Sequence, residues 1–294
     1  MKLLVVNADD YGLAVGVNAG VIEGYRHGII TSTTIMANGQ ALADGVSRLQ
    51  ESPDLGVGCH LVLLGGEPVA KAAQVRSLID TTGRFPATLT AFLARFAAGW
   101  VKPVEIITEF RAQLDRLLGL GLTISHCDSH KHAHAHPAVL DALIQVAEEY
   151  KIRYIRNPFE HCVFAVRQQL SREMRRAFYK RYLLGKLLGY YRMIFRMRIR
   201  ETFLRCPDHF YGFLLTGHLQ PEVMLQILAQ MPEGLSELMC HPARLEPDLL
   251  NCATRLKASR ERELAAVTAS STRQAIDALG IQLTSFRALA QQYK

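Results

Sequence analysis

Short apolar segments alternate with longer amphipathic ones along most of this chain, and polar residues stand where several of the apolar segments end. Because strands that alternate with helices form βαβ units, this order predicts a parallel sheet covered by helices. The strands that we expect are residues 3–10, 33–37, 57–63, 122–128, 153–156, 235–240 and 281–284. The helices that we expect are residues 16–28, 41–50, 89–98, 103–118 and 137–150.

The polar motifs follow at least four different strands, which favours an α/β fold of the (β/α)-barrel type, related to the TIM barrel in complete or distorted form. A length of 294 residues suits one such domain over residues 1–294, with a basic helical insertion at 161–205. Six cysteines without a CxxC pair argue against a zinc ribbon or a disulfide framework and fit a reducing cytosol. We expect neither a signal peptide nor a transmembrane helix.

Two adjacent carboxylates, Asp9 and Asp10, end the first expected strand in the run NADDYG at residues 7–12. Their mutual repulsion must be offset, and a divalent cation is a common way to do so. Neighbouring residues on a strand point to opposite sides, so both carboxylates reach one site only if the strand ends or bends, which Gly12 allows. The alternative is an acid pair that caps a helix beside a turn.

A cluster of histidines, SHCDSHKHAHAHP at residues 125–137, is the strongest indication of a metal site. If this run is extended, residues 126, 128, 130, 132 and 134 share one face, with four imidazoles and a carboxylate. Neutral imidazole suits zinc and similar divalent ions, and a carboxylate can bind the metal or hold a histidine in its tautomer. The alternative is a surface loop that scavenges metal, although the run lies between an apolar strand and a helix that begins at Pro137.

Two further histidines follow expected strands: His60 in GCHL at residues 58–61 and His241 in ELMCHP at residues 237–242. Each alone could be a structural residue. An aspartate and two histidines around a divalent ion with an open position are, however, the outline of a hydrolytic site. A free carboxylate would then take a proton from water, and a separate acid would protonate a leaving amine.

Taken together, these motifs resemble the YdjC-like carbohydrate deacetylases. The resemblance rests on NADDYG at 7–12, GIITSTT at 28–34, GCHL at 58–61, DSHKH at 128–132 and CHP at 240–242, which stand in the family's order. It implies a (β/α) barrel-like fold, one divalent metal ion (Mg²⁺ or Zn²⁺), and removal of an acetyl group from an N-acetylated sugar. The implied metal ligands are Asp10, His60 and His130, with Asp9 as general base and His241 as general acid.

The resemblance also suggests roles for residues near these. Arg156 begins the run RNPFE, which is similar to an Arg-x-Pro-x-Glu step of the family, and would hold Asp9 ionised or contact the substrate. The rest of the histidine cluster would contact the substrate or support the ligands; these residues are His126, Asp128, His132 and His134.

The net charge of +7 is concentrated in one segment. Residues 167–205 hold twelve Lys or Arg and two Glu, a balance of +10, so the rest of the chain has a balance of −3. The run AFYKRYLLGKLLGYYRMIFRMRIR at 177–200 mixes large apolar residues with basic ones, as in a helix that lies on anionic lipid. Gly185 and Gly189 weaken one continuous helix by about 1 kcal/mol each. A core or dimer helix is an alternative, and we expect no nucleic-acid partner.

The basic segment and DHFYG at 208–212 resemble the hopanoid-biosynthesis-associated deacetylases within the family. This implies an N-acetylglucosaminyl group on a membrane lipid such as a hopanoid as the substrate, and a cytoplasmic enzyme in peripheral contact with the anionic inner face of the cytoplasmic membrane. The alternatives are a soluble chito-oligosaccharide deacetylase, a metal hydrolase of phosphoesters or cyclic amides, and a non-catalytic metal- or lipid-binding protein. A homodimer is compatible with each.

Overall fold

The computed structural model describes residues 1–187 and 189–292, and their strands form one curled sheet. Its order is β5-β4-β3-β2-β1-β7-β6, with β8 paired to the first half of β1, and all these pairings are parallel. The strands are β1 (Lys2–Tyr11), β2 (Ser32–Ile35), β3 (Gly56–Leu61), β4 (His126–Ser129), β5 (Tyr154–Ile155), β6 (His209–Tyr211), β7 (Gly234–Cys240) and β8 (Ile281–Leu283).

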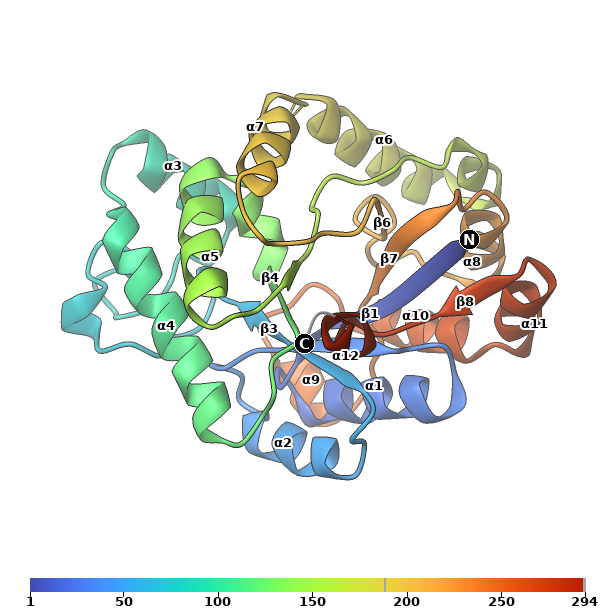
Figure 1. Ribbon diagram of the computed structural model, residues 1–294, viewed down its shortest axis with the longest axis horizontal. Coiled ribbons are helices and arrows are strands. Elements are labelled where there is room, and N and C mark those ends of the chain that lie inside the picture. Colours follow the sequence, from blue (N-terminus) through green and yellow to red (C-terminus); the bar gives the residue numbers. More distant parts are fainter. Residues whose placement is uncertain (188, 293–294) are drawn as a thin grey trace.

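Helices surround this sheet, with α6 and α7 along one edge of the molecule (Figure 1). The α-helices are α1 (Val15–His27), α2 (Leu42–Gln50), α3 (Leu89–Ala97), α4 (Pro103–Gly119), α5 (Pro137–Glu149), α6 (Arg172–Leu187), α7 (Gly189–Arg200), α8 (Pro221–Ala229), α9 (Pro247–Asn251), α10 (Ala258–Thr268), α11 (Ser270–Ala278) and α12 (Phe286–Gln291). Three short 3₁₀ segments are η1 (Ala72–Gln74), η2 (His130–Ala135) and η3 (Phe164–Gln169). Among the described residues, none of these helices has both the length and the apolar character needed to cross a bilayer.

The sheet curls until its two end strands approach each other. An isolated parallel bridge joins Tyr154 of β5 to Arg205, and the N–H of His161 donates to the carbonyl of Phe210 in β6 at 2.8 Å. These contacts replace a regular ladder between β5 and β6. The predicted (β/α) barrel-like fold is thus confirmed in a distorted form.

Strand β1 is buried on both of its faces, which explains its continuous apolar sequence. Leu4, Val6 and Ala8 belong to the main core that packs against the helices. Val5 faces the other way and packs in a smaller cluster with Phe286 of α12 at the amino ends of the strands. Residues that alternate with the core positions near the carboxyl ends are therefore free to form a polar site inside the barrel.

The expected helices are present within two residues at each end, but the strand expected at 122–128 starts four residues later than predicted. Strand β4 begins only at His126, and the chain leaves the extended conformation directly after Ser129. Lys131 and His132 have positive φ angles of 54° each, so 130–134 is not extended and its histidines do not share one face. Strand β6 and helices α8 to α12 had no sequence prediction.

The basic segment forms helices rather than a loop. Helix α6 extends to Leu187, and α7 begins at Gly189, one of the two glycines expected to weaken a continuous helix. Leu188 lies outside the described residues.

Candidate metal centre

Both adjacent aspartates reach the same site because β1 is irregular where they stand. The register with β2 shifts between Ala8 and Tyr11, and Asp10 has a φ of 66°. This left-handed conformation is uncommon for a residue with a side chain and typical of functional sites. The bend that the sequence predicts therefore lies at Asp10 itself, just before Gly12, whose φ is 89°.

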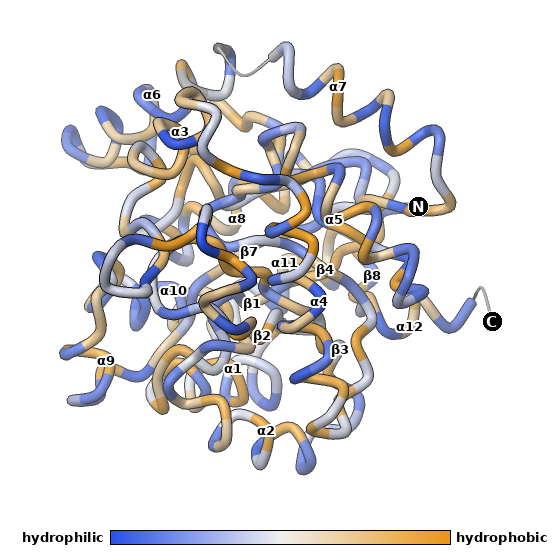
Figure 2. Tube along the Cα trace, turned by 90° about the vertical axis from the view of Figure 1, so that its left-hand side faces the viewer, coloured by the Kyte–Doolittle hydropathy of each residue, from blue (hydrophilic) through white to orange (hydrophobic). Residues whose placement is uncertain are grey.

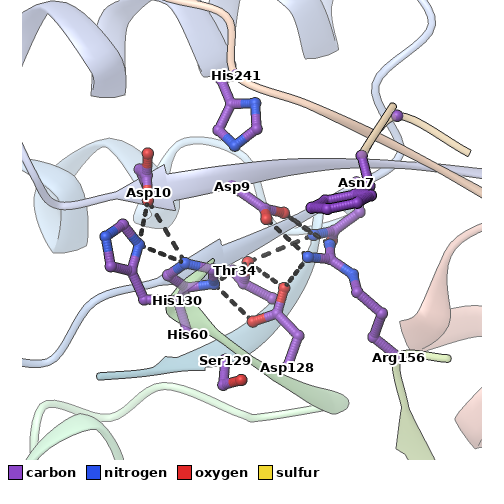
Figure 3. Close-up of polar contacts among 12 residues, drawn as sticks. Asn7, Asp9, Asp10, Thr34, His60, Asp128, Ser129, His130, Arg156 and His241 are labelled. Carbon is purple, nitrogen blue, oxygen red and sulfur yellow. Dashed lines mark hydrogen bonds and ion pairs between the residues drawn. The ribbon is translucent and has the colours of Figure 1, made fainter. Parts of the chain in front are cut away.

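Three donor atoms from the carboxyl ends of three strands converge (Figure 3). Oδ1 of Asp10 lies 3.1 Å from Nδ1 of His130 and 3.4 Å from Nε2 of His60, and the two ring nitrogens are 3.2 Å apart. Donors bound at about 2.1 Å to one ion lie roughly 3.0–3.4 Å apart when they are neighbours in its coordination shell. The triangle thus has the dimensions of three neighbouring ligands of one divalent ion.

The bonding of Asp10 also fits a cation at this point. Its Oδ1 atom is buried and has no hydrogen-bond partner among the described residues. A second cluster, made of Asp9, His60 and Asp128, is similarly compact, but every carboxylate oxygen in it already accepts a bond from a nitrogen donor. The donor set of Asp10, His60 and His130 is therefore the better candidate for a metal ion.

His60 is held with one ring nitrogen toward this cluster. Its Nδ1 lies 2.6 Å from Oδ1 of Asp128, and Thr34 Oγ1 donates to the other oxygen of Asp128 at 3.2 Å. A carboxylate on one ring nitrogen sets the tautomer that leaves Nε2 free to bind a metal. Burial alone would lower the pKa of His60, but the carboxylates of Asp128 and Asp10 raise it to about 10. The same negative field would stabilise a divalent cation in place of the ring proton.

Arg156 connects three buried carboxylates in the barrel interior. Its Nη1 and Nη2 each lie 2.6 Å from an oxygen of Asp9, its Nη1 lies 2.7 Å from Asp128, and its Nε lies 2.7 Å from Glu237. Burial would raise the pKa of Asp9, but Arg156 holds that pKa well below its usual range. Asp9 is therefore ionised beside the cluster without belonging to the Asp10 triangle.

His241 directly follows β7 in the chain. In space, His241 and Asp128 lie on opposite sides of Asp9 (Figure 3). Its backbone N–H donates to Oε2 of Glu263 at 2.6 Å, and its Nδ1 lies 3.6 Å from the same oxygen. Burial would raise the pKa of Glu263, but hydrogen bonding and charge from His241 lower it. A histidine beside an ionised carboxylate is suited to hold and release a proton.

The other histidines of the cluster support the backbone or pack against rings. His126 is buried, lies 2.9 Å from Asn7 Oδ1 and stacks on Phe286. His134 is buried, with Nδ1 2.5 Å from Ser129 Oγ and Nε2 3.2 Å from the carbonyl of Arg156. His132 packs edge-on against the rings of Phe210 and Phe213. Of the four expected supporting residues, only Asp128 directly bonds a residue of the donor triangle among the described residues.

Three charged residues of the site had no sequence prediction: Glu237, Arg260 and Glu263. Glu237 carries a visible signal, because it is the one charged residue in the apolar strand 235–240. Arg260 donates to Asp10 Oδ2 at 2.5 Å, and Glu263 contacts His241. Both lie in the run SRERELAAV, whose alternating charges are typical of a solvated helix, so the sequence offers no such signal for them.

Comparison with known proteins gives one family. A family model described as YdjC-like protein matches residues 3–278. A carbohydrate deacetylase of Brevibacillus brevis is 36% identical over 287 residues, which cover 97% of this chain and 99% of that protein. A carbohydrate deacetylase of Thermoanaerobacter pseudethanolicus is 31% identical over 289 residues, covering 98% and 100%.

A solved structure gives the same picture of the fold. A protein of Enterococcus faecalis proposed to cleave cellobiose-phosphate superposes with a TM-score of 0.78 at 25% identity, over 98% of both chains. The sequence matches span nearly the whole chain and include every element that contributes to the site. The chain therefore belongs to the YdjC-like family.

Proposed function

We propose that this protein is a metal-dependent hydrolase that removes the acetyl group from an N-acetylated aminosugar. The observation that carries the proposal is the convergence of Asp10, His60 and His130 beside an ionised Asp9 that is not one of the three. The relatives named carbohydrate deacetylases support the substrate class. Two imidazole donors favour a first-row ion such as Zn²⁺ over Mg²⁺.

The residues around the donor triangle divide the proton transfers between them. A divalent ion bound there would supply Lewis acidity and lower the pKa of a water molecule. Asp9 accepts the proton of the attacking water, and Arg156 keeps Asp9 ionised and fixed by two hydrogen bonds. Because Arg156 makes Asp9 a weak base, its effect comes from position rather than from basicity.

His241, which lies on the side of Asp9 away from Asp128, supplies the second proton transfer. It protonates the nitrogen of the aminosugar as the bond between this nitrogen and the acetyl carbon breaks. Glu263, whose oxygen lies 3.6 Å from Nδ1 of His241, stabilises the positive charge of the protonated ring.

The test is acetate release from N-acetylated chito-oligosaccharides and from an N-acetylglucosaminyl lipid, with phosphoesters and a cyclic amide as alternative substrates. We expect acetate release that a chelator stops and that added Zn²⁺ restores. Asp9→Asn and His130→Ala should greatly reduce it, whereas Asp54→Asn, at an exposed aspartate, should not. Full activity in both site variants, or turnover of phosphoesters alone, would refute the proposal.

We further propose that the aminosugar is attached to a membrane lipid, such as a hopanoid, at the inner face of the cytoplasmic membrane. Helix α7 buries Phe195 and Ile199 and exposes Tyr190, Met193 and Met197, which are 66%, 52% and 56% accessible. Hydrophobic and hydrophilic residues alternate along this helix (Figure 2). Large exposed apolar side chains among arginines suit an anionic lipid surface.

The exposed face of α7 also has a shallow hollow of about 300 Å³, lined by Gly189, Arg192, Met193, Arg196, Met197 and Arg200. The helix packs near the site, because the ring of Tyr191 lies 6.1 Å from that of His136, which directly follows η2. A bilayer at this face would therefore lie near the segment that carries His130.

Vesicle sedimentation tests the membrane proposal separately from the chemistry. We expect the protein to bind vesicles with anionic lipid more strongly than neutral ones, and salt to weaken the binding. The double variant Arg196→Glu/Arg200→Glu should lose this binding and keep its activity on soluble oligosaccharides. Arg116→Glu, at an exposed arginine of α4, is the matched control. Equal binding by the double variant and the wild type would refute a role for α7.

A further inference from the structure

Helix α10 places two buried, oppositely charged side chains one turn apart behind the site. Arg260 is 1% and Glu263 is 2% accessible, and residues three apart on a helix lie on the same face. Arg260 reaches β1, where it donates to Asp10. Glu263 reaches the end of β7, where it accepts from His241, and its other oxygen accepts from the N–H of Gly217 at 2.7 Å.

We infer that Arg260 and Glu263 are positioning residues, which set the donor atom of Asp10 and the placement of His241 through one turn of helix α10. This rests on the proposed function for the roles of Asp10 and His241. Neither residue need touch the metal or the substrate. Each acts by fixing a side chain that does.

Arg260 selects which oxygen of Asp10 faces the donor triangle. Its Nη2 lies 2.5 Å from Oδ2, whereas Oδ1 is the oxygen near both imidazoles and has no hydrogen-bond partner among the described residues. A free carboxylate can give a metal one oxygen or two. With Oδ2 bonded to a buried guanidinium, Asp10 would offer a metal ion only one oxygen, which would leave a coordination position for water or substrate.

Arg260 is itself fixed at a second atom. Its Nε donates to the carbonyl of Leu256 at 3.0 Å, so the guanidinium is held between the start of α10 and Asp10. A lysine has no second donor group with this geometry. Lysine at this position should therefore reproduce the charge without reproducing the constraint.

Glu263 fixes His241 through its backbone and faces its ring with the same oxygen. Oε2 accepts the backbone N–H at 2.6 Å, and Nδ1 of the ring is buried with no hydrogen-bond partner among the described residues, 3.6 Å away. Asp9 of β1 and His132 of η2 also interact electrostatically with this ring. Of these groups, Glu263 alone also bonds the His241 backbone. It is therefore placed to orient the ring for proton donation to a leaving nitrogen.

Cobalt substitution tests the role of Arg260 without measuring activity. The visible absorption of Co²⁺ in the full-length protein reports the number and arrangement of its ligands. In Arg260→Met, Asp10 is free to offer both oxygens, so the absorption bands should weaken and shift relative to the wild type. Arg260→Lys should also change them, while Arg262→Met, at the exposed neighbour on the same helix, should leave them unchanged. Spectra of Arg260→Met identical to the wild type would overturn this half of the inference.

Leaving-group dependence tests the role of Glu263 in the zinc-loaded protein. Glu263→Gln should lower kcat on the N-acetyl aminosugar by about 10- to 100-fold, with little change in KM. Hydrolysis of p-nitrophenyl acetate should be much less affected, because its leaving group needs no proton donor. Glu263→Asp should restore part of the loss on the aminosugar. Glu261→Gln, at an exposed glutamate two residues earlier on another face of the helix, should behave as wild type.

Equal losses of kcat on the aminosugar and on p-nitrophenyl acetate would mean that Glu263 has a structural role only, and would overturn its half of the inference. A wild type that releases acetate from neither substrate would refute the proposed function and with it the role of Glu263. The cobalt spectra decide the role of Arg260 in either case.

Discussion

The guanidinium of Arg156 binds both carboxylate oxygens of Asp9, with Nη1 2.6 Å from Oδ2 and Nη2 2.6 Å from Oδ1. The adjacent Asp10 is bonded differently, with one oxygen on Arg260 and the other near two imidazoles. Two neighbours of the same residue type thus have different electrostatic surroundings. This difference supports the proposed division into a base and a metal ligand.

Substitution of the two aspartates should separate metal binding from chemistry. Asp9→Asn should keep the Zn²⁺ affinity and lower kcat by about 10²- to 10⁴-fold, because the proton acceptor is lost and the donor triangle is not. Asp10→Asn should weaken Zn²⁺ binding itself, because an amide oxygen carries no charge. Titration calorimetry and acetate release measure the two effects. Weaker metal binding in Asp9→Asn than in Asp10→Asn would reverse the assignment.

Loss of Arg156 should destabilise the fold as well as the site. Arg156→Met leaves three buried carboxylates, those of Asp9, Asp128 and Glu237, without their shared cation. Breaking a buried ion pair in this way costs about 3–5 kcal/mol of unfolding free energy. Urea unfolding followed by circular dichroism measures it. Arg116→Met, at an exposed position, should stay within about 0.5 kcal/mol of the wild type.

Glu237 should make stability fall as the pH rises through the weakly acidic range. Burial raises the pKa of Glu237 to about 7, although Arg156 opposes this, and its ordinary value is 4.5. Between these two values the folded state binds more protons than the unfolded state, so the free energy of unfolding decreases with rising pH. This contribution is complete below about pH 4.5 and is lost as the pH passes 7.

The variant Glu237→Gln isolates that contribution, because its amide does not titrate. The difference in unfolding free energy between wild type and variant should shrink or change sign from pH 4.5 to pH 7. Urea unfolding at several pH values provides the measurement. A difference that does not depend on pH would show that Glu237 is ionised throughout this range.

The contact between α1 and the segment after β7 should tolerate no added methyl group. A Cβ on Gly20 would lie 2.5 Å from the Cα of Ala243, two residues after His241. Gly20→Ala should therefore cost about 1–3 kcal/mol of stability and lower kcat by displacing His241. Gly119→Ala is the control, because its Cβ would meet nothing within 4 Å. Thermal unfolding and acetate release of both variants test this, and unchanged values in Gly20→Ala would contradict it.

The sequence by itself predicted the parallel α/β architecture and the residues that form the donor triangle. The architecture followed from the alternation of apolar and amphipathic segments, whereas Asp10, His60 and His130 were singled out by the resemblance to the YdjC-like family. The carboxyl ends of parallel strands meet at one edge of a sheet, which is consistent with the convergence of these three residues. The apolar strand pattern was equally informative, since β1 is buried on both faces.

Only the tertiary structure decided how the residues of the site differ from one another. The left-handed backbone at Asp10 separates its bonding from that of Asp9, and nothing in the run NADDYG fixes that angle. Arg260 lies 250 positions from Asp10, in a helix whose charges look like those of a solvated surface. Their pairing depends on how α10 packs against the sheet. Periodicity and local propensity carry no information on such long-range contacts between buried charges.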